Sequence, residues 1–414
     1  MSNPPKITNL GSTLITTKTK TNLSLTEFVI LISLMTSLTA LSIDAMLPAL
    51  PKIGSDLGVQ NANDRQLVIS MIFMGLSFGQ LFFGPLSDSI GRKPAIYGGL
   101  ILYMAGSLLA MVAATFPIML LGRLIQGIGI SSPRAVTLAL VRDQFEGRTM
   151  ARVMSFVSTV FILVPMLAPT MGQTILLFSG WRSIFGVYVG LAMIVLVWLG
   201  LRQPETLAPE DRAPFTRQRV FNTTKEIFKN RLAFGYTVTV GLVSGAFVGY
   251  LNSAQQIFQE QYALGTLFPI YFAIIASSIG LASLANSHLV MQYGMRLLVK
   301  ISMFVIVIVS VIALGIALFT AGRPPLWLLI TYLMAAFFCV GILFGNLNAL
   351  AMLPLGHIAG IGAAIVGSLS TLLSTVLGTL IGQSYNGTIF PLVIGLAVLV
   401  GLSIIVVRWA EAAD

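Results

Sequence analysis

Long apolar runs occupy most of this chain and leave it few ways to fold. A helix that crosses the hydrocarbon core of a bilayer needs about 20 apolar residues. Twelve runs of roughly that length follow one another, at 25–47, 66–87, 94–113, 117–141, 153–176, 183–201, 234–257, 266–290, 297–319, 326–349, 359–383 and 388–408. Charged side chains make up only 9% of the 414 residues, against about 25% in soluble domains. The sequence therefore predicts an all-α integral membrane protein with twelve transmembrane helices.

Basic residues outnumber acidic residues by 24 to 14, which gives a formal net charge of +10. When the N-terminus is placed in the cytoplasm, most of these cations fall on the cytoplasmic side. The opposite side then receives only Lys52, Arg65, Arg182 and Arg323. This positive-inside bias predicts that both termini are cytoplasmic, and it accounts for the net charge without a nucleic-acid partner. The single cysteine, Cys339, excludes an intramolecular disulfide.

A polar stretch at 202–231 divides the apolar runs into two sets of six. The sequence therefore predicts an N-terminal six-helix bundle at 1–201, a cytoplasmic linker at 202–231 and a C-terminal six-helix bundle at 232–414. Within the linker, apolar residues recur about seven positions apart among cations, at Val220, Phe221, Ile227 and Phe228. This spacing predicts a short amphipathic helix on the membrane surface. A solvated linker is the alternative.

A ten-residue polar turn, 84–93, lies between the second and third apolar runs. Glycine and proline suit a tight turn that ends a helix, but they do not explain the carboxylate and two cations in the same turn. The pattern Gly-x-Leu-x-Asp-x-x-Gly-Arg-Lys resembles the loop signature between spans 2 and 3 of the major facilitator superfamily. That family has two pseudo-symmetric six-helix bundles and a site at mid-membrane. The resemblance implies a conformational motif made of Gly84, Asp88, Gly91, Arg92, Lys93 and Asp143, in which Arg92 meets Asp143 and the turn meets the start of span 11.

The fourth apolar run carries an arginine several residues from its start. A cation inside a span is costly, and helical geometry places Gln126 on the same face as Arg123. The pattern Arg-x-x-Gln-Gly-x-Gly resembles the span-4 motif of the superfamily, which is associated with proton coupling. The alternative is that Arg123 extends along the helix to the nearer membrane surface. Arg134 follows about three turns later and is predicted either to face the substrate cavity or to cap carbonyl groups near the end of the span.

The fifth apolar run contains Pro165, Pro169 and Gly172. Proline kinks a helix, and glycine allows close packing against a neighbouring helix. Together they resemble the span-5 motif that marks antiporters within the superfamily. The pair Trp181-Arg182 resembles the next loop of drug exporters, which favours export over uptake.

Asp44 is the only acidic residue well inside an apolar run. An apolar site favours the neutral form of a carboxyl group, whereas a nearby arginine favours the charged form, so such a group can load and release a proton. The arrangement Asp-x-x-x-Pro-x-x-Pro resembles the first span of Bcr/CflA-type multidrug and chloramphenicol exporters, which are drug:proton antiporters. The resemblance implies that Asp44 carries the proton and that Arg123 tunes its affinity. The alternative is a solvated residue at the mouth of the protein.

A polar cluster in the seventh apolar run includes Tyr250, Asn252 and Gln255. Drug-efflux relatives have a Ser-Pro pair at this place, and here Ala254 replaces the proline. Together with Arg134 and Gln126, these side chains are expected to line a largely apolar cavity rich in Met and Phe, whose adaptable surfaces suit varied substrates.

These features predict an antiporter of the bacterial inner membrane that exports small amphipathic drugs in exchange for protons by alternating access, and so confers antibiotic resistance. A dedicated exporter of a sugar, nucleoside or siderophore is the alternative. A membrane enzyme or channel is disfavoured, because the sequence contains no metal-ligand cluster, nucleotide-binding loop or nucleophile triad. We therefore expect no enzymatic activity, no cofactor and no bound metal. We also expect the protein to act as a monomer in the lipid bilayer, with protons and a small molecule as its partners.

Overall fold

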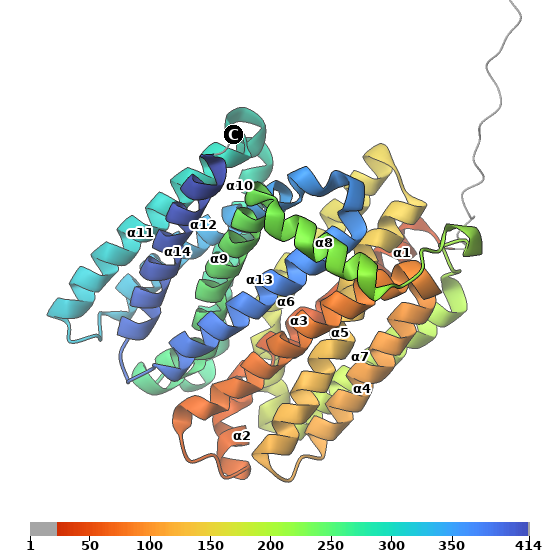
Figure 1. Cartoon of the computed structure of the whole chain (residues 1–414). Helices are drawn as coiled ribbons and strands as arrows, with labels where there is room; N and C mark the ends of the chain where they lie inside the picture. Colours follow the sequence, from red (N-terminus) through yellow and green to blue (C-terminus); the bar gives the residue numbers. More distant parts are fainter. Residues whose placement is uncertain (1–22, 413–414) are drawn as a thin grey trace, which may run out of the picture.

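The computed structural model describes residues 23–412, and this part of the chain is helical without a strand. Twelve helices of 20 residues or more cross the molecule (Figure 1). They are α1 (Leu25–Asp44), α3 (Leu67–Ile90), α4 (Arg92–Met111), α5 (Phe116–Gln144), α6 (Gly147–Ser179), α7 (Arg182–Arg202), α9 (Arg231–Gln255), α10 (Phe268–Tyr293), α11 (Met295–Phe319), α12 (Leu326–Met352), α13 (Ala359–Gln383) and α14 (Phe390–Glu411).

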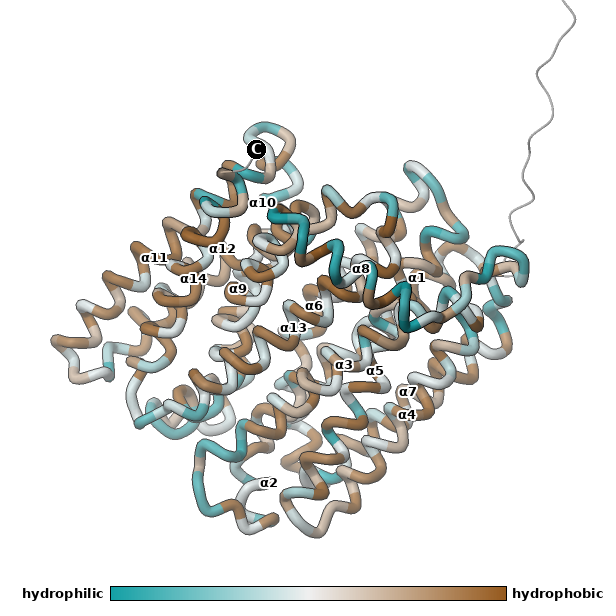
Figure 2. Tube along the Cα trace, in the orientation of Figure 1, coloured by the Kyte–Doolittle hydropathy of each residue, from teal (hydrophilic) through white to brown (hydrophobic). Residues whose placement is uncertain are grey.

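The twelve predicted spans are confirmed. Eleven segments of the described chain are long and apolar enough to cross a membrane, and one of them, Leu326–Gln383, contains both α12 and α13. The turn η6 (Leu353–Ile358) separates these two helices, because Pro354 lies in its first turn and the backbone leaves the helical conformation at Leu355. Many large apolar residues are exposed on the outside of the molecule, as lipid contact requires, and hydrophobic residues run along the long helices (Figure 2).

The helices pack as two groups (Figure 1). Helices α1 and α3 to α7 contact one another, as do α9 to α14, and the groups meet mainly where α3 packs on α13 and α6 packs on α10. Small residues bring neighbouring helices close together. At Gly106 of α4, for example, an added Cβ would overlap the backbone of Gln126 in α5.

Short elements lie at the two ends of the bundle. At one end are η1 (Leu47–Ala49), α2 (Leu50–Asp56), η2 (Ala62–Gln66), η4 (Gln256–Gln261) and η5 (Gly265–Leu267). At the other end, η3 (Pro209–Asp211) and α8 (Arg217–Lys229) follow α7, and α8 runs across the ends of the long helices (Figure 1). We call these the α2 end and the α8 end.

Helix α8 is the amphipathic element of the linker. Its first turn is capped by Thr216, whose hydroxyl oxygen accepts the backbone N–H of Arg219 at 3.3 Å. Ile227 is buried against the bundle, whereas Phe221 and Phe228 are exposed. That this exposed face contacts a membrane surface remains a prediction. The division of the chain into two domains and a linker also remains a prediction.

Candidate functional site

A cavity of about 350 Å³ lies between the two groups of helices. Both groups contribute to its wall, which is mostly apolar and includes the aromatic residues Phe73, Phe247, Phe272, Phe337 and Phe344. The polar side chains in the wall include Thr39, Asp44, Gln80, Arg134, Asn348 and Ser370. The expected abundance of phenylalanine is present, but no methionine lines this cavity in the described part of the chain. The expectation of a Met-rich cavity was therefore wrong.

Asp44 is the last residue of α1 and faces the cavity. It is only 6% exposed, and no hydrogen bond or ion pair joins it to another residue in the described range 23–412. The antiporter-motif helix packs directly beside it: a Cβ on Gly172 of α6 would overlap the carbonyl group of Ala45. Pro165 of the same motif reaches the cavity wall, whereas Pro169 does not line it. The structure thus brings Gly172 and Asp44 to one place.

Arg123 lies inside the N-terminal bundle rather than at a membrane surface. It is completely buried, and its guanidinium donates to the carbonyl oxygens of Ser42 at 2.8 Å and Val68 at 3.0 Å. It also donates to the amide oxygen of Gln126 at 2.6 Å, and Gln126 in turn donates to Ser107 at 2.9 Å. This network connects α1, α3, α4 and α5, and it holds α1 two residues before Asp44. Gln126 serves this network and does not line the cavity.

Arg134 lies on the same helix as Arg123, eleven residues further along, which is about 16 Å along the helix axis. Its side chain is exposed and lines the cavity. Because it faces this space, it belongs to the cavity wall and not to the end of the helix.

Only one of the three polar residues predicted from the seventh span reaches the cavity. Tyr250 lines it, packs its ring 4.7 Å from that of Phe337, and has a buried hydroxyl group without a hydrogen-bond partner among the described residues. Asn252 instead donates to Ser70 of α3 at 3.2 Å. Gln255 accepts a hydrogen bond from Gln66 at 3.2 Å. Both therefore join the two groups of helices.

The contact between Gln66 and Gln255 belongs to a polar seam at the α2 end, which sequence reasoning missed. Asn63 donates to the carbonyl oxygens of Gln383 and Tyr385, both at 2.9 Å, and accepts from Gln256 at 2.7 Å. We call this set the α2-end seam: Asn63, Arg65 and Gln66 on one side, and Gln255, Gln256, Glu260, Gln383 and Tyr385 on the other. The two sides of the seam are far apart in the chain, so no local sequence pattern predicted that they would meet.

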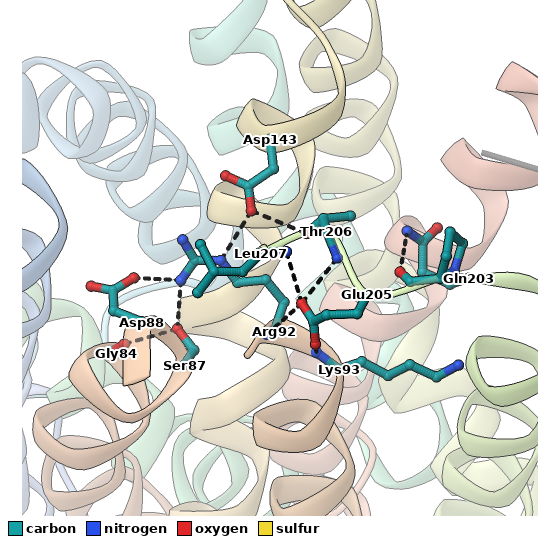
Figure 3. Close-up of polar contacts among 11 residues, drawn as sticks. Gly84, Ser87, Asp88, Arg92, Lys93, Asp143, Gln203, Glu205, Thr206 and Leu207 are labelled. Atoms are coloured by element: carbon teal, nitrogen blue, oxygen red, sulfur yellow. Dashed lines mark hydrogen bonds and ion pairs between the residues drawn. The ribbon is translucent and has the colours of Figure 1, made fainter. Parts of the chain in front are cut away.

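The loop motif forms a charged cluster at the α8 end (Figure 3). Arg92 donates to Asp143 at 3.0 Å and to Ser87 at 3.0 Å, and it also forms an ion pair with Asp88. The contact between Arg92 and Asp143 that the resemblance implies is therefore present. The side-chain ammonium group of Lys93 donates instead to the carbonyl oxygen of Gly200 at 2.8 Å.

The two glycines of the motif allow a backbone conformation and a close helix contact that a larger residue would disfavour. Gly91 has φ of 110°, a conformation that favours glycine, and it separates α3 from α4. Gly84 faces α13, where an added Cβ would lie 2.7 Å from the Cβ of Ala364. Asp88 lies close to Gly360, because a Cβ there would be 3.4 Å from its carboxylate. The turn thus meets the start of α13, which is span 11.

Glu205 in the linker completes this cluster, although no sequence pattern singled it out. Its carboxylate accepts the backbone N–H groups of Arg92 at 2.9 Å and Lys93 at 3.0 Å, at the start of α4 (Figure 3). It also accepts the N–H groups of Thr206 and Leu207, at 2.9 and 3.0 Å. A carboxylate at a helix N-terminus is stabilised by the free N–H groups there. We call Asp88, Arg92, Asp143, Glu205 and Thr206 the α8-end cluster.

Comparison with known proteins gives a consistent result. The family model described as Major Facilitator Superfamily matches residues 32–379. The chain is 30% identical to the uncharacterized MFS-type transporter YdgK of Bacillus subtilis, over 85% of this chain and 87% of the relative. It is 27% identical to a bicyclomycin resistance protein homolog of Haemophilus influenzae, over 91% and 94%. It is 29% identical to the multidrug resistance protein MdtL of Klebsiella pneumoniae, over 78% and 80%.

The fold has solved counterparts. The xylose transporter XylE from E. coli, in a partially occluded inward open conformation, superimposes with a TM-score of 0.69 at 14% identity, over 93% of this chain and 96% of that one. At this identity the likeness concerns the fold alone.

Proposed function

The chain belongs to the Major Facilitator Superfamily, and from that premise we propose that it exports small amphipathic drugs across the bacterial inner membrane in exchange for protons. The names of two relatives refer to bicyclomycin resistance and to multidrug resistance. The observation that carries the proposal is the central cavity, whose mostly apolar wall contains five phenylalanines. Aromatic walls with few fixed polar partners accept apolar bodies of varied shape.

Alternating access requires that contacts at the two ends form and break in turn. The α2-end seam joins the helix groups at one end, and the start of α13 meets Gly84 and Asp88 at the other. The positive-inside bias supports a cytoplasmic location for the α8 end and both termini. In this proposal substrate enters from the cytoplasm, and the α2 end opens outward to release it.

Protons supply the driving force in this proposal, and Asp44 carries them. Its support is geometric: Asp44 combines burial, access to the cavity and a position beside Gly172 at the end of α1. Arg123 holds the preceding turn through Ser42, so a movement of α1 would change the distance between this cation and Asp44. The protein would act as a monomer, without catalysis and without a cofactor.

The test uses cells that lack their own drug pumps. Expression of the protein should protect growth against several chemically unrelated compounds, and a proton uncoupler should abolish efflux of a fluorescent member of the panel. Protection against a single metabolite and no drug would favour the dedicated exporter. Efflux that persists with the uncoupler would remove proton coupling from the proposal.

A further inference from the structure

The cavity contains a cation without a counter-ion. Arg134 lines the cavity and forms no hydrogen bond, ion pair or ring contact with any residue in the described range. The acidic residue in the cavity wall, Asp44, follows Ser42 by two residues, and Ser42 accepts a hydrogen bond from Arg123. Arg134 lies about 16 Å along α5 from Arg123. Arg134 is therefore available to a ligand.

Other arginines of the bundle differ from Arg134 in this respect. Arg92 pairs with Asp88 and Asp143, and Arg65 pairs with Glu260. Arg123, which pairs with no carboxylate among the described residues, donates to two backbone carbonyl groups and to a side-chain amide oxygen. A cation inside a membrane protein is costly unless it is paired, bound to carbonyl groups or hydrated. Arg134 has neither of the first two, so water or a ligand must complete its contacts.

We infer that the cavity is built for amphipathic organic anions, in which a carboxylate pairs with Arg134 and an aromatic body packs on the phenylalanine wall. This inference rests on the proposed function and names the class of its substrate. The planar guanidinium matches a carboxylate with two parallel hydrogen bonds. Phe247 and Phe344 line the same cavity with ring centroids 5.7 Å apart and offer ring faces and edges to an aromatic body. A neutral ligand would leave the guanidinium without a countercharge.

The position of Arg134 also sets the orientation of the ligand. The acidic group would point toward the α8 end of α5, and the apolar body would extend toward the level of Asp44. A carboxylate placed beside Asp44 would be repelled by that group in its charged form. The two charged groups of the wall therefore favour the same orientation of the ligand.

The experiment compares an acid with its neutral amide. Purified full-length protein in lipid nanodiscs is titrated with naphthoic acid and with naphthamide, which share one aromatic body, and binding is measured by calorimetry. Hydrogen bonds to charged groups contribute about 1.5–3 kcal/mol, which corresponds to roughly 10- to 150-fold in affinity. We expect the acid to bind the unmodified protein at least tenfold more tightly than the amide.

Two variants and a control locate the effect. Arg134→Gln should abolish the preference for the acid while binding of the amide is retained, and Arg134→Lys should keep part of the preference because it keeps the charge but not the planar donor. Arg142→Gln removes a cation from the same helix outside the cavity wall and should leave the preference intact. Retained amide binding also establishes that each variant is folded.

These binding measurements can reject the anion-binding site without rejecting drug export, and the reverse. Equal affinity of the unmodified protein for acid and amide overturns the inference, even if the Arg134→Gln variant cannot be purified, and leaves drug export standing. A preference that survives Arg134→Gln overturns it as well. An acid preference that depends on Arg134, in a protein that protects cells against no drug, would support the binding site and reject the drug-export proposal.

Discussion

Arg65 and Glu260 form an ion pair between the two helix groups, with the Nη1 of Arg65 lying 3.1 Å from the Oε1 of Glu260. Arg65 is held for this contact by its own turn, since its Nε donates to the carbonyl oxygen of Ala62 at 2.9 Å. The pair is part of the α2-end seam. In the proposed transport cycle, opening at this end separates the two residues, so we expect the pair to stabilise the closed state.

Arg65→Gln should increase access from the α2 end. Partly exposed ion pairs contribute about 0.2–1 kcal/mol, which corresponds to roughly a 1.4- to 5-fold shift in the open population. The measurement is the rate at which an impermeant maleimide labels a Ser70→Cys variant in a Cys339→Ser background. Ser70 is a suitable reporter because it is buried beneath the seam, where it meets Asn252 and Thr379.

The matched control is Lys52→Gln. Lys52 lies at the same end and pairs with Asp56 at 2.9 Å, but both residues belong to α2. Its removal should leave the labelling rate unchanged. Equal acceleration by both variants would mean that loss of positive charge, and not the contact between the helix groups, controls opening.

Gly172→Ala should disturb the end of α1. The added methyl group overlaps the backbone carbonyl of Ala45, which cannot move without displacing Asp44. Overpacking of this kind costs about 1–3 kcal/mol. We expect a lower midpoint of thermal unfolding in detergent and a loss of transport. Gly190→Ala is the control, because nothing lies within 4 Å of an added Cβ there; comparable losses in both variants would remove any special role of Gly172.

The sequence predicted the parts of this molecule that depend on local patterns. Apolar length alone locates the twelve spans, and the charged turn that ends α3 is contiguous in the chain. The α2-end seam was missed because its partners are as far apart as Asn63 and Gln383, 320 residues along the chain. Glu205 was missed for the same reason, since it lies 113 residues from Arg92.

Rotation about the helix axis explains why only one of the residues that were predicted from span 7 to line the cavity does so. Successive residues of an α-helix are turned by about 100°, so Asn252 lies about 200° around α9 from Tyr250. When Tyr250 faces the cavity, Asn252 must face another neighbour, and it meets Ser70 of α3. Composition showed that the segment is polar. Which of its residues face the cavity depends on how α9 packs in the whole bundle, and composition does not reveal that.

Asp88→Asn should slow transport and leave substrate affinity nearly unchanged. Asp88 contacts Arg92 and the start of α13, where the two helix groups meet. Relative movement of the two groups must change these contacts. Asp88 lies outside the cavity wall. Initial rates of export and equilibrium binding of the same fluorescent substrate measure the two effects separately. Asp211→Asn, in the exposed part of the linker, should change neither. A tenfold loss of affinity with unchanged turnover would assign Asp88 to substrate binding instead.

Glu205→Gln should loosen the start of α4. The carboxylate accepts four backbone N–H groups with two oxygens, whereas an amide offers one oxygen acceptor. Amide hydrogen exchange in the peptide that contains Arg92 and Lys93 should therefore become faster. Glu210→Gln, at an exposed position of the same linker, is the control. Unchanged exchange in the Glu205 variant would show that other contacts of the α8-end cluster suffice to hold α4.

Asp44→Asn should abolish proton-driven export while substrate binding persists. The amide imitates the protonated acid permanently, so the site can no longer take up a proton on one side and release it on the other. Each coupled proton supplies about 1.4 kcal/mol per unit of pH difference, and the variant loses access to this free energy. We expect no accumulation of substrate in inverted vesicles with an imposed pH gradient, but retained exchange of labelled for unlabelled substrate without a gradient.

Conservative and control variants sharpen this test of Asp44. Asp44→Glu keeps a titratable carboxyl group and should retain partial gradient-driven transport, whereas Asp211→Asn removes an exposed carboxylate and should have no effect. Full gradient-driven accumulation by the Asp44→Asn variant would exclude Asp44 as the proton carrier. Glu260 would then be the next carboxylate to test, because its ion pair with Arg65 joins the helix groups, and its protonation would remove the charge that holds Arg65 across the α2-end seam.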